Sequence, residues 1–279
     1  MDVLTTISEF ANVRKFFTGS LGFVPTMGAL HQGHISLIKK SLVENEKTAC
    51  SIFVNPIQFN NPDDFNKYPI TLERDLELLH KAGCDLVFAP SASEMYPEKP
   101  NLKFDFGALE TVMEGAFRPG HFNGVAVVVS KLFHITQPTI SYFGQKDLQQ
   151  TQVIKRLVAD LGFQTKLQIV ETLRESDGLA MSSRNVRLTE SNRQLSSVLF
   201  TELRLAQNRI LAGESIEKVA AQSKFTLESY KEIRLEYFEI VNASTLLSID
   251  TEYSGEIAIC VAAYFEEVRL IDNIVFQRK

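Results

Sequence analysis

Short apolar runs alternate with amphipathic segments from Leu21 to Val170, and this alternation restricts the fold of the chain more than any other feature. Each apolar run has the length and composition of a buried strand, and each amphipathic segment has the apolar spacing of a helix. Strands that alternate with helices predict right-handed βαβ units and a mostly parallel sheet. The expected strands lie at residues 21–24, 49–54, 85–90, 139–143 and 165–170. The expected helices lie at residues 35–43, from residue 71 to a stop at Gly83, and at residues 147–161.

Two segments of this first part are less regular. A polar loop is expected at residues 60–64, and the run at 125–133 reads as fully buried. The periodicity of that run fits a helix as well as a strand, so its structure stays open at this point.

The pattern changes after about Leu173. Two expected helices, at residues 191–211 and 215–231, precede strand-like runs at 237–241, 256–263 and 268–276. Helices followed by strands are typical of an α+β domain. We therefore predict an α/β fold, with a Rossmann-like parallel-sheet domain at residues 1–173 and a smaller C-terminal α+β domain at residues 174–279.

Charge and composition exclude several classes of function. The net charge of −5 argues against a general surface for nucleic acid or anionic membranes. No segment approaches the roughly 20 apolar residues that a membrane span needs, and the N-terminus does not resemble a targeting signal, so we expect a cytoplasmic protein. The cysteines, Cys50, Cys84 and Cys260, form no CxxC pair, so neither a zinc site nor a disulfide framework is indicated.

Residues 23–37 carry the most informative local pattern, a strand followed by a glycine-punctuated turn and a helix that opens with His31 and His34. Such a turn aims unpaired backbone N–H groups at the space in front of the helix, where phosphates bind. Gly28 and Gly33 have the spacing of a P-loop, but His34 and Ile35 replace its Lys and Ser/Thr, and no GxGxxG is present. A second cluster of small and cationic residues follows at 178–185. The two clusters together indicate an enzyme that handles ATP without a P-loop.

The two histidines have competing interpretations. His31 and His34 lie on one helical face and could ligate a metal ion, but no Glu lies between them and no third ligand is evident nearby. A generic pair with this spacing is more often a set of local hydrogen-bonding residues at a helix start.

A third interpretation comes from five segments that carry a family resemblance in the same order: residues 25–34, 54–59, 118–125, 142–150 and 174–187. The first resembles the HxGH signature of the nucleotidylyl transferase superfamily, and the last contains a variant of the KMSKS loop with Arg184 in the cationic role. In particular, the chain resembles the pantothenate synthetase family of pantoate–β-alanine ligases over almost its whole length.

This resemblance implies a reaction in two steps. The pantoate carboxylate attacks the α-phosphate of ATP and releases pyrophosphate, and the amine of β-alanine then attacks the pantoyl adenylate to give pantothenate and AMP. The family also implies a homodimer. We expect the active site in the crevice at the carboxyl ends of the parallel strands, with the C-terminal domain as a lid.

The resemblance also assigns residues. It implies that His34 is the proton-donating catalytic residue, and that Gln58 and Gln150 bind pantoate, with Gln58 also bordering the β-alanine site. It implies that ATP contacts Met27, Gly28, Ala29, Leu30, His31, Gln32, Gly33, His34, Gly144, Gln145, Lys146, Asp147, Leu173, Met181, Ser182, Ser183 and Arg184. Gln145 replaces the usual Glu of the family, which puts a charge-dependent role at that position in doubt.

Some assignments stay open. Mg²⁺ is expected through the ATP phosphates and not in a dedicated protein site, and Asp75 is either a contact to that ion or an ordinary aspartate in the first turn of a helix. Residues 118–124 are a candidate segment for closing over pantoate, with the roles of Arg118 and His121 undecided. The rival functions are an adenylyl transferase with another acceptor, a catalytically silent nucleotide-binding module and, more distantly, a metal hydrolase.

Overall fold

The computed structural model describes residues 1–60, 65–66 and 68–279. The loop predicted at residues 60–64 therefore lies, from residue 61 on, outside the described residues. The chain divides into two compact units. Unit 1 comprises Met1–Gly144 and Gln150–Glu171, and unit 2 comprises Gln145–Gln149 and Thr172–Lys279.

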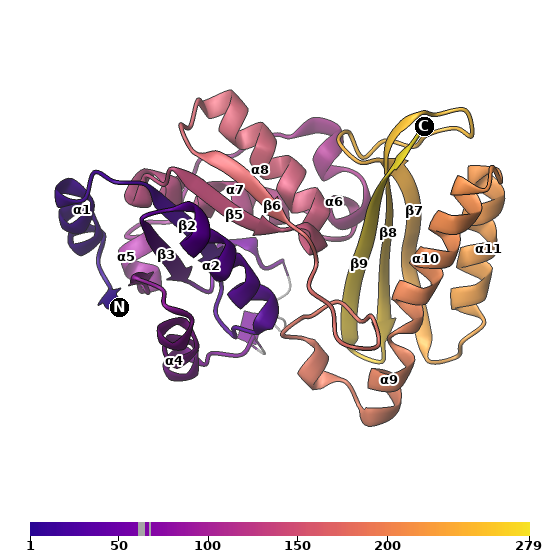
Figure 1. The fold of residues 1–279 in the computed structure, drawn as a ribbon, viewed down its shortest axis with the longest axis horizontal. Coiled ribbons are helices and arrows are strands. Elements are labelled where there is room, and N and C mark those ends of the chain that lie inside the picture. The colour runs from indigo at the N-terminus through magenta and orange to yellow at the C-terminus, as the bar shows by residue number, and fades with distance from the viewer. Residues whose placement is uncertain (61–64, 67) are drawn as a thin grey trace. The chain divides into compact units, whose positions relative to one another are not determined.

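Unit 1 is built on a six-stranded sheet in which all neighbouring pairs are parallel, in the order β1-β4-β3-β2-β5-β6 (Figure 1). Its strands are β1 (Asp2–Leu4), β2 (Leu21–Thr26), β3 (Lys47–Ile52), β4 (Leu86–Phe88), β5 (Ile140–Gly144) and β6 (Lys166–Val170). Its longer helices are α1 (Ile7–Phe16), α2 (Gln32–Glu44), α4 (Leu72–Ala82), α7 (His121–Thr136) and α8 (Leu148–Leu161), of which α8 begins within unit 2. Its shorter helices are η1 (Pro56–Gln58), α5 (Ala92–Met95), η2 (Gly107–Glu110) and α6 (Met113–Phe117).

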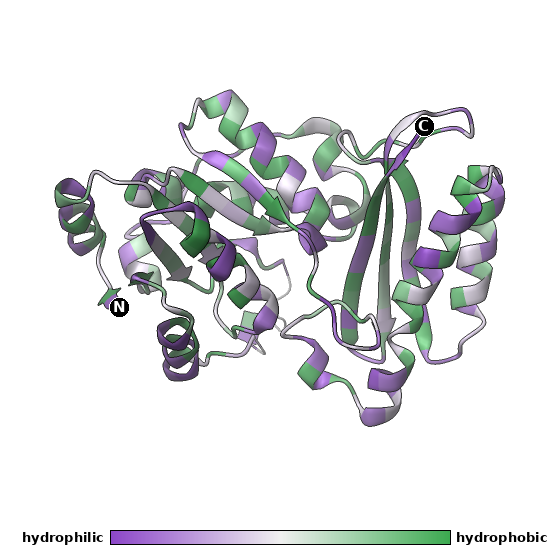
Figure 2. Cartoon of the chain, in the orientation of Figure 1, coloured by the Kyte–Doolittle hydropathy of each residue, from purple (hydrophilic) through white to green (hydrophobic). Residues whose placement is uncertain are grey.

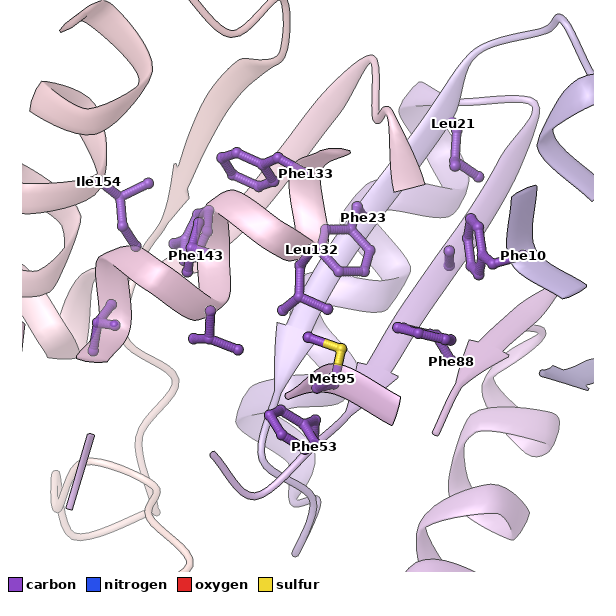
Figure 3. Packing of buried hydrophobic residues seen from close by; sticks show 14 of the residues in the cluster. Phe10, Leu21, Phe23, Phe53, Phe88, Met95, Leu132, Phe133, Phe143 and Ile154 are labelled. Atoms are coloured by element: carbon purple, nitrogen blue, oxygen red, sulfur yellow. The ribbon is translucent and has the colours of Figure 1, made fainter. Parts of the chain in front are cut away.

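Helices cover both faces of this sheet because the strands are apolar on both sides. Phe23 belongs to a buried cluster with Phe10 of α1 and with residues of α7 and α8, as Figure 3 shows for part of the cluster. The next residue, Val24, belongs to a second cluster with Ile38 of α2 and Leu79 of α4. Successive side chains of a strand point to opposite faces. The unit is therefore a doubly wound α/β structure, as predicted.

The strand order places the ends of β2 and β5 side by side at the carboxyl edge of the sheet. Strand β2 pairs with β3 on one side and with β5 on the other. The direction of winding changes at this point, which is where open α/β sheets bind their ligands. The loop after Thr26 and the chain after Gly144 both leave the sheet here.

Unit 2 contains a three-stranded antiparallel sheet in the order β7-β8-β9. Its elements are η3 (Gln145–Asp147), η4 (Asn185–Arg187), α9 (Glu190–Leu195), α10 (Val198–Leu211), α11 (Ile216–Glu228), β7 (Ile233–Asn242), β8 (Gly255–Phe265) and β9 (Val268–Arg278). Leu203 of α10 and Val219 of α11 pack in one cluster with Phe238 and Ile259 of the sheet. Figure 2 shows hydrophobic and hydrophilic residues together on α10 and α11, as expected for helices with one buried face.

The structure resolves or changes several local predictions. The run at residues 125–133 is helical and lies within α7. The single helix predicted at residues 191–211 is wrong, because α9 ends at Leu195 and α10 begins at Val198. The hydroxyls of Ser196 and Ser197 donate to the carbonyls of Arg193 (2.8 Å) and Gln194 (3.2 Å). Such serine bonds compete with the helical hydrogen bonds and explain the interruption.

The alternation of apolar runs did not reveal β1 and α1, which precede Leu21. The helix α1 begins with a capping box in which the Thr6 side chain and the Glu9 carboxylate each accept a backbone N–H of the other. That Thr-x-x-Glu spacing is visible in the sequence and is the signal that could have located the helix.

Candidate active site

The loop between β2 and α2 is held by a buried carboxylate. Asp75 of α4 is fully buried, and its Oδ2 and Oδ1 accept the backbone N–H groups of Ala29 and Leu30, each at 2.8 Å. The Thr71 hydroxyl donates to the same carboxylate at 3.2 Å. Asp75 does lie in the first turn of α4, as one of its two interpretations from sequence had it, and its oxygens in addition hold the loop as a clamp. Ala29 has a φ of 50°, a conformation that side-chain-bearing residues seldom adopt, and the clamp stabilises it there.

The amides of the glycine turn also have partners within the loop. The N–H of Gly28 donates to Thr26 Oγ1 and the N–H of Gly33 donates to His31 Nδ1, both at 3.2 Å. The expectation that the turn leaves its backbone N–H groups unpaired is therefore wrong for these two glycines. Short polar side chains next to a helix start accept such orphan donors readily, and here the loop's own side chains do so.

The paired histidines form a capping box at the start of α2. His31 is the N-cap residue, and its backbone N–H donates to His34 Nδ1 at 3.3 Å. The Nδ1 of His31 accepts from Gly33 as described above, and the two ring centroids are 4.0 Å apart. A ring nitrogen that accepts a hydrogen bond carries no proton, so the proton of each neutral ring lies on Nε2. The arrangement therefore supplies two Nε2–H donors at the positive end of a helix dipole, a setting suited to anionic oxygens.

Gln58 lies beside this loop. Its Nε2 donates to the Met27 sulfur at 3.0 Å, and its Oε1 accepts from Asn55 Nδ2 at 3.0 Å. The side chain is buried. The structure thus brings together two of the residues that the sequence assigned to different substrates, Met27 to ATP and Gln58 to pantoate.

A network of buried polar groups fixes the short helix η1 that carries Gln58. Asn55 Nδ2 also donates to the carbonyl of Gly124 at 3.1 Å, and the Tyr96 hydroxyl donates to Asn55 Oδ1 at 2.9 Å. Burial raises the pKa of the Tyr96 hydroxyl, so that it remains a donor. The Nδ1 of His121 lies 2.9 Å from the Gln58 carbonyl. Gly124 allows this close approach, since a Cβ there would lie 2.5 Å from a backbone oxygen of η1.

In unit 2, the turn η3 contains three of the predicted ATP-binding residues, Gln145, Lys146 and Asp147. Gln145 and Lys146 are half-buried and Asp147 is exposed, with its carboxylate 3.9 Å from Lys146 Nζ. The carbonyls of Gln145 and Lys146 both accept from Asn273 of β9. Gln150 is half-buried in the first turn of α8, within unit 1.

The KMSKS-like segment of unit 2 is an organised loop. The N–H of Met181 donates to the carbonyl of Leu173 at 3.0 Å, and Arg174 and Ala180 form an antiparallel bridge. The N–H of Arg184 donates to Ser182 Oγ at 3.2 Å. Met181, Ser182, Ser183 and Arg184 are all half-buried, and Leu173 is exposed.

Comparison with known proteins identifies the family. The family model for pantoate-beta-alanine ligase matches residues 2–275. The chain belongs to the pantoate-beta-alanine ligase family. It is 52% identical over 259 residues to the pantothenate synthetase of Cytophaga hutchinsonii, covering 92% of this chain and 91% of that protein. It is 47% identical over 274 residues to the pantothenate synthetase of Chloroflexus aurantiacus, covering 98% and 97% of the two chains.

Solved ligase structures resemble this one closely. The pantothenate synthetase of Thermus thermophilus superposes with a TM-score of 0.93 at 42% identity, covering 98% of this chain and 99% of the other. The pantoate-beta-alanine ligase of Francisella tularensis, solved with Beta-gamma ATP and Beta-alanine, gives a TM-score of 0.82 at 37% identity and 99% and 97% coverage. The predicted resemblance and fold class are thereby confirmed.

Each unit of this ligase gathers its own share of the predicted residues. Met27, Gly28, Ala29, Leu30, His31, Gln32, Gly33, His34, Gln58, Gly144 and Gln150 lie in unit 1, and Gln145, Lys146, Asp147, Leu173, Met181, Ser182, Ser183 and Arg184 lie in unit 2. Among the described residues, no group of three or more His, Cys, Asp or Glu side chains could hold a metal ion. No described helix is long and apolar enough to cross a membrane.

Sequence reasoning missed the supporting roles of three residues in this ligase, Asp75, Asn273 and Asn55. Asp75 had a detectable signal, because it shares the spacing of Leu72, Leu76 and Leu79 and so interrupts an apolar helical stripe with a charge. Asn273 had a weaker signal, because it forms a polar pair with Asp272 inside the apolar run at residues 270–276. Asn55 had none, because its role depends on Tyr96 and Gly124, which are far from it in the sequence.

Proposed function

We propose that this chain joins pantoate to β-alanine through a pantoyl adenylate, with the release of pyrophosphate and then AMP. The overall reaction, ATP-dependent ligation of pantoate with β-alanine, is that of the family to which the chain belongs. The Francisella tularensis relative was solved with an ATP compound and β-alanine, which supports these two as substrates here. The adenylate is the intermediate that links the two half-reactions.

The main observation behind this proposal is the capping box that His31 and His34 form at the start of α2. In the first step, a carboxylate oxygen of pantoate bonds to the α-phosphorus of ATP, and the bond to the bridging oxygen breaks to release pyrophosphate. Negative charge builds on the phosphate oxygens in this transition state, and preorganised donors stabilise it. Because each Nδ1 accepts a backbone amide, each ring is locked with Nε2–H as its donor. We propose that His34 donates a hydrogen bond to the α-phosphate and that His31 supplies a neighbouring donor.

The remaining ATP contacts are proposed from the family pattern. In unit 1 they are Met27, Gly28, Ala29, Leu30, Gln32, Gly33 and Gly144, and in unit 2 they are Gln145, Lys146, Asp147, Leu173, Met181, Ser182, Ser183 and Arg184. Lys146 and Arg184 supply positive charge for the phosphates, and Ser182 and Ser183 supply hydroxyl donors. Because the amides of Gly28 and Gly33 have other partners, we give these glycines a shaping role in which they let the loop approach the nucleotide closely.

The pantoate contacts are proposed at Gln58 and Gln150, and Gln58 also borders the β-alanine position. A neutral amide can bind the carboxylate and hydroxyls of pantoate without the dehydration cost of a charged group. Gln58 is held by Asn55, so its amide has a fixed orientation before the substrate binds. In the second step, the amine of β-alanine attacks the carbonyl carbon of the adenylate, loses a proton, and AMP leaves.

Mg²⁺ is proposed to enter with ATP. The carboxylate of Asp75, considered as a contact to the ion, does not fit this role because both of its oxygens accept amide donors in a fully buried setting. A magnesium ion prefers phosphate oxygens and water, and its function here is to offset phosphate charge. We further propose a homodimer in the cytoplasm, and a lid role for residues 174–279, on the strength of the family pattern alone.

Product analysis tests the proposal. The purified protein is incubated with ATP, Mg²⁺ and pantoate, with pyrophosphate measured first and AMP measured after β-alanine is added. We expect pyrophosphate release to require pantoate and multiple turnovers to require β-alanine. Pyrophosphate release that is independent of pantoate would show that another acceptor is used, and no release with any acid would indicate a silent nucleotide-binding module.

A further inference from the structure

Two adjacent residues of β9, Asp272 and Asn273, contact both candidate ATP-binding segments of unit 2. Both are buried, and both are polar within the run at residues 270–276 of β9, which is otherwise apolar. Successive residues of a strand point to opposite faces of the sheet. The two adjacent residues can therefore bind two different segments, one from each face of the sheet.

Asn273 binds the turn η3. Its Nδ2 donates to the carbonyl of Gln145 at 3.0 Å and to the carbonyl of Lys146 at 2.8 Å. The two hydrogens of one amide thus fix two consecutive carbonyls, which determines the path of the backbone that carries Lys146. A buried amide whose donors are both used in this way is costly to replace, since the carbonyls would lose their partner.

Asp272 binds the start of the KMSKS-like segment. Its two oxygens accept from Arg174 Nη1 at 2.6 Å and Nη2 at 3.0 Å, a bidentate pair. Arg174 Nη1 also donates to the carbonyl of Gly178 at 3.0 Å, and the guanidinium lies 3.8 Å from the centroid of the Phe200 ring. Arg174 therefore ties the hairpin at residues 174–180 to the sheet. The segments are connected further, because Arg174 Nη2 donates to the Asn273 carbonyl at 3.2 Å.

We propose that Asp272 and Asn273 are positioning residues for ATP, which hold Lys146 and the Ser182–Arg184 loop in register with each other. The inference rests on the ATP-binding roles proposed for Lys146 and for Ser182, Ser183 and Arg184. Neither residue touches the substrate in this scheme. Both act through the backbone of the segments that do.

The test is the variant Asn273→Asp, which keeps the size of the side chain but replaces two donors with an acceptor that faces two carbonyl oxygens. We expect the KM for ATP to rise at least tenfold, with the KM for pantoate changed less than twofold. ATP affinity measured directly by titration calorimetry should fall by a similar factor. The variant Asn273→Ser, which retains one donor, should give an intermediate loss, and it supplies the comparison if Asn273→Asp does not fold.

The matched control is Asn242→Asp on β7 of the same sheet. Asn242 Nδ2 also donates to a half-buried partner, the Tyr253 hydroxyl at 2.6 Å, but it contacts neither ATP-binding segment. We expect this control to leave the KM for ATP unchanged and to alter the thermal midpoint little, because the Tyr253 hydroxyl can donate to the new carboxylate. A second arm, Arg174→Lys, keeps the charge opposite Asp272 but loses the bidentate pair, and should also raise the KM for ATP.

The outcomes separate this inference from the proposed function. If Asn273→Asp loses stability but keeps an ATP affinity within twofold of the wild type, Asn273 is only structural and the inference is wrong. If the wild type binds ATP but releases no pyrophosphate with pantoate, the proposed reaction is wrong. The ATP affinities measured by calorimetry still test the positioning role in that case.

Discussion

The buried carboxylate of Asp75 accepts the backbone N–H of Ala29 at 2.8 Å and so joins α4 to the loop that carries the paired histidines. The second oxygen binds the next amide, that of Leu30, at the same distance. Two charge-assisted bonds to consecutive amides hold a left-handed residue, Ala29, in place two residues before the N-cap of α2. The position of His31 and His34 therefore depends on a residue from another helix.

Asp75→Asn should damage both stability and the first half-reaction. The amide retains one acceptor oxygen but presents an N–H₂ group to a backbone donor, which leaves one buried amide without its partner. We expect the free energy of unfolding to fall by roughly 2–3 kcal/mol and pantoate-dependent pyrophosphate release to fall at least tenfold. Urea unfolding and a pyrophosphate assay measure the two effects. Glu73→Gln, an exposed acid in the same first turn, is the control and should change neither; an equally active Asp75→Asn variant would contradict the clamp.

Variants of His34 should separate its capping role from its catalytic role. His34→Ala removes the acceptor for the His31 amide as well as the Nε2–H donor, so we expect a loss of about 1 kcal/mol in stability and orders of magnitude in adenylation. His34→Glu restores an acceptor at the third helical position, where Glu is the usual capping-box residue, but offers no donor and adds negative charge.

The expected result for His34→Glu is therefore a stability close to that of the wild type with adenylation as low as in His34→Ala. Thermal unfolding and single-turnover pyrophosphate release provide the two measurements. Substantial adenylation by His34→Glu would mean that the ring is needed only as a cap, and the catalytic assignment would then be wrong.

Much of the sheet could be predicted because it depends on local apolar patterns. Each expected strand between Leu21 and Val170 lies at a strand of the structure, since buried strands leave continuous apolar runs in the sequence. The strand β1 has only three residues and was too short to leave such a run. The break between α9 and α10 was missed because it depends on hydroxyls that bond locally, and apolar periodicity does not register them.

The site was predicted less completely for a different reason. The residues proposed to contact substrates lie in motifs that can be recognised, such as the one around His34. Residues that hold those motifs come from distant segments: Asp75 lies 46 residues from Ala29, and Asn273 lies 128 residues from Gln145. Which distant residue meets a loop depends on strand order and register, which one sequence does not reveal. The hydrogen-bonded amides of Gly28 and Gly33 illustrate the same limit, because their partners are set by loop geometry.

Gln58→Glu should weaken pantoate binding selectively. The substitution keeps the oxygen that accepts from Asn55 but replaces the donor near Met27 with a negative charge, which repels the pantoate carboxylate. We expect the KM for pantoate to rise at least tenfold and the KM for ATP to change by less than a factor of three. Gln164→Glu, on the exposed segment before β6, is the control and should change neither constant. An unchanged KM for pantoate in Gln58→Glu would contradict the proposed pantoate site.

The buried thiol of Cys84 should make the protein less stable at alkaline pH. Burial raises the pKa of Cys84 to about 12, and its sulfur donates to the Leu86 carbonyl at 3.3 Å, so the folded thiol stays protonated. The same thiol ionises near pH 8.5 when the chain is unfolded, so its contribution to stability is complete below about pH 8.5 and is lost as the pH rises toward 12. Between pH 7 and pH 10 this one group should cost about 2 kcal/mol.

The variant Cys84→Ala isolates this effect, because only the difference between the two pH values is compared and the cost of the lost sulfur cancels. Urea unfolding at pH 7 and pH 10 should show a decrease in the free energy of unfolding that is about 2 kcal/mol smaller in the variant than in the wild type. A thiol reagent at pH 8 should label Cys84 in urea but not in the folded protein. Equal decreases in the two proteins, or rapid labelling of the folded thiol, would show that burial does not hold this group in its neutral form.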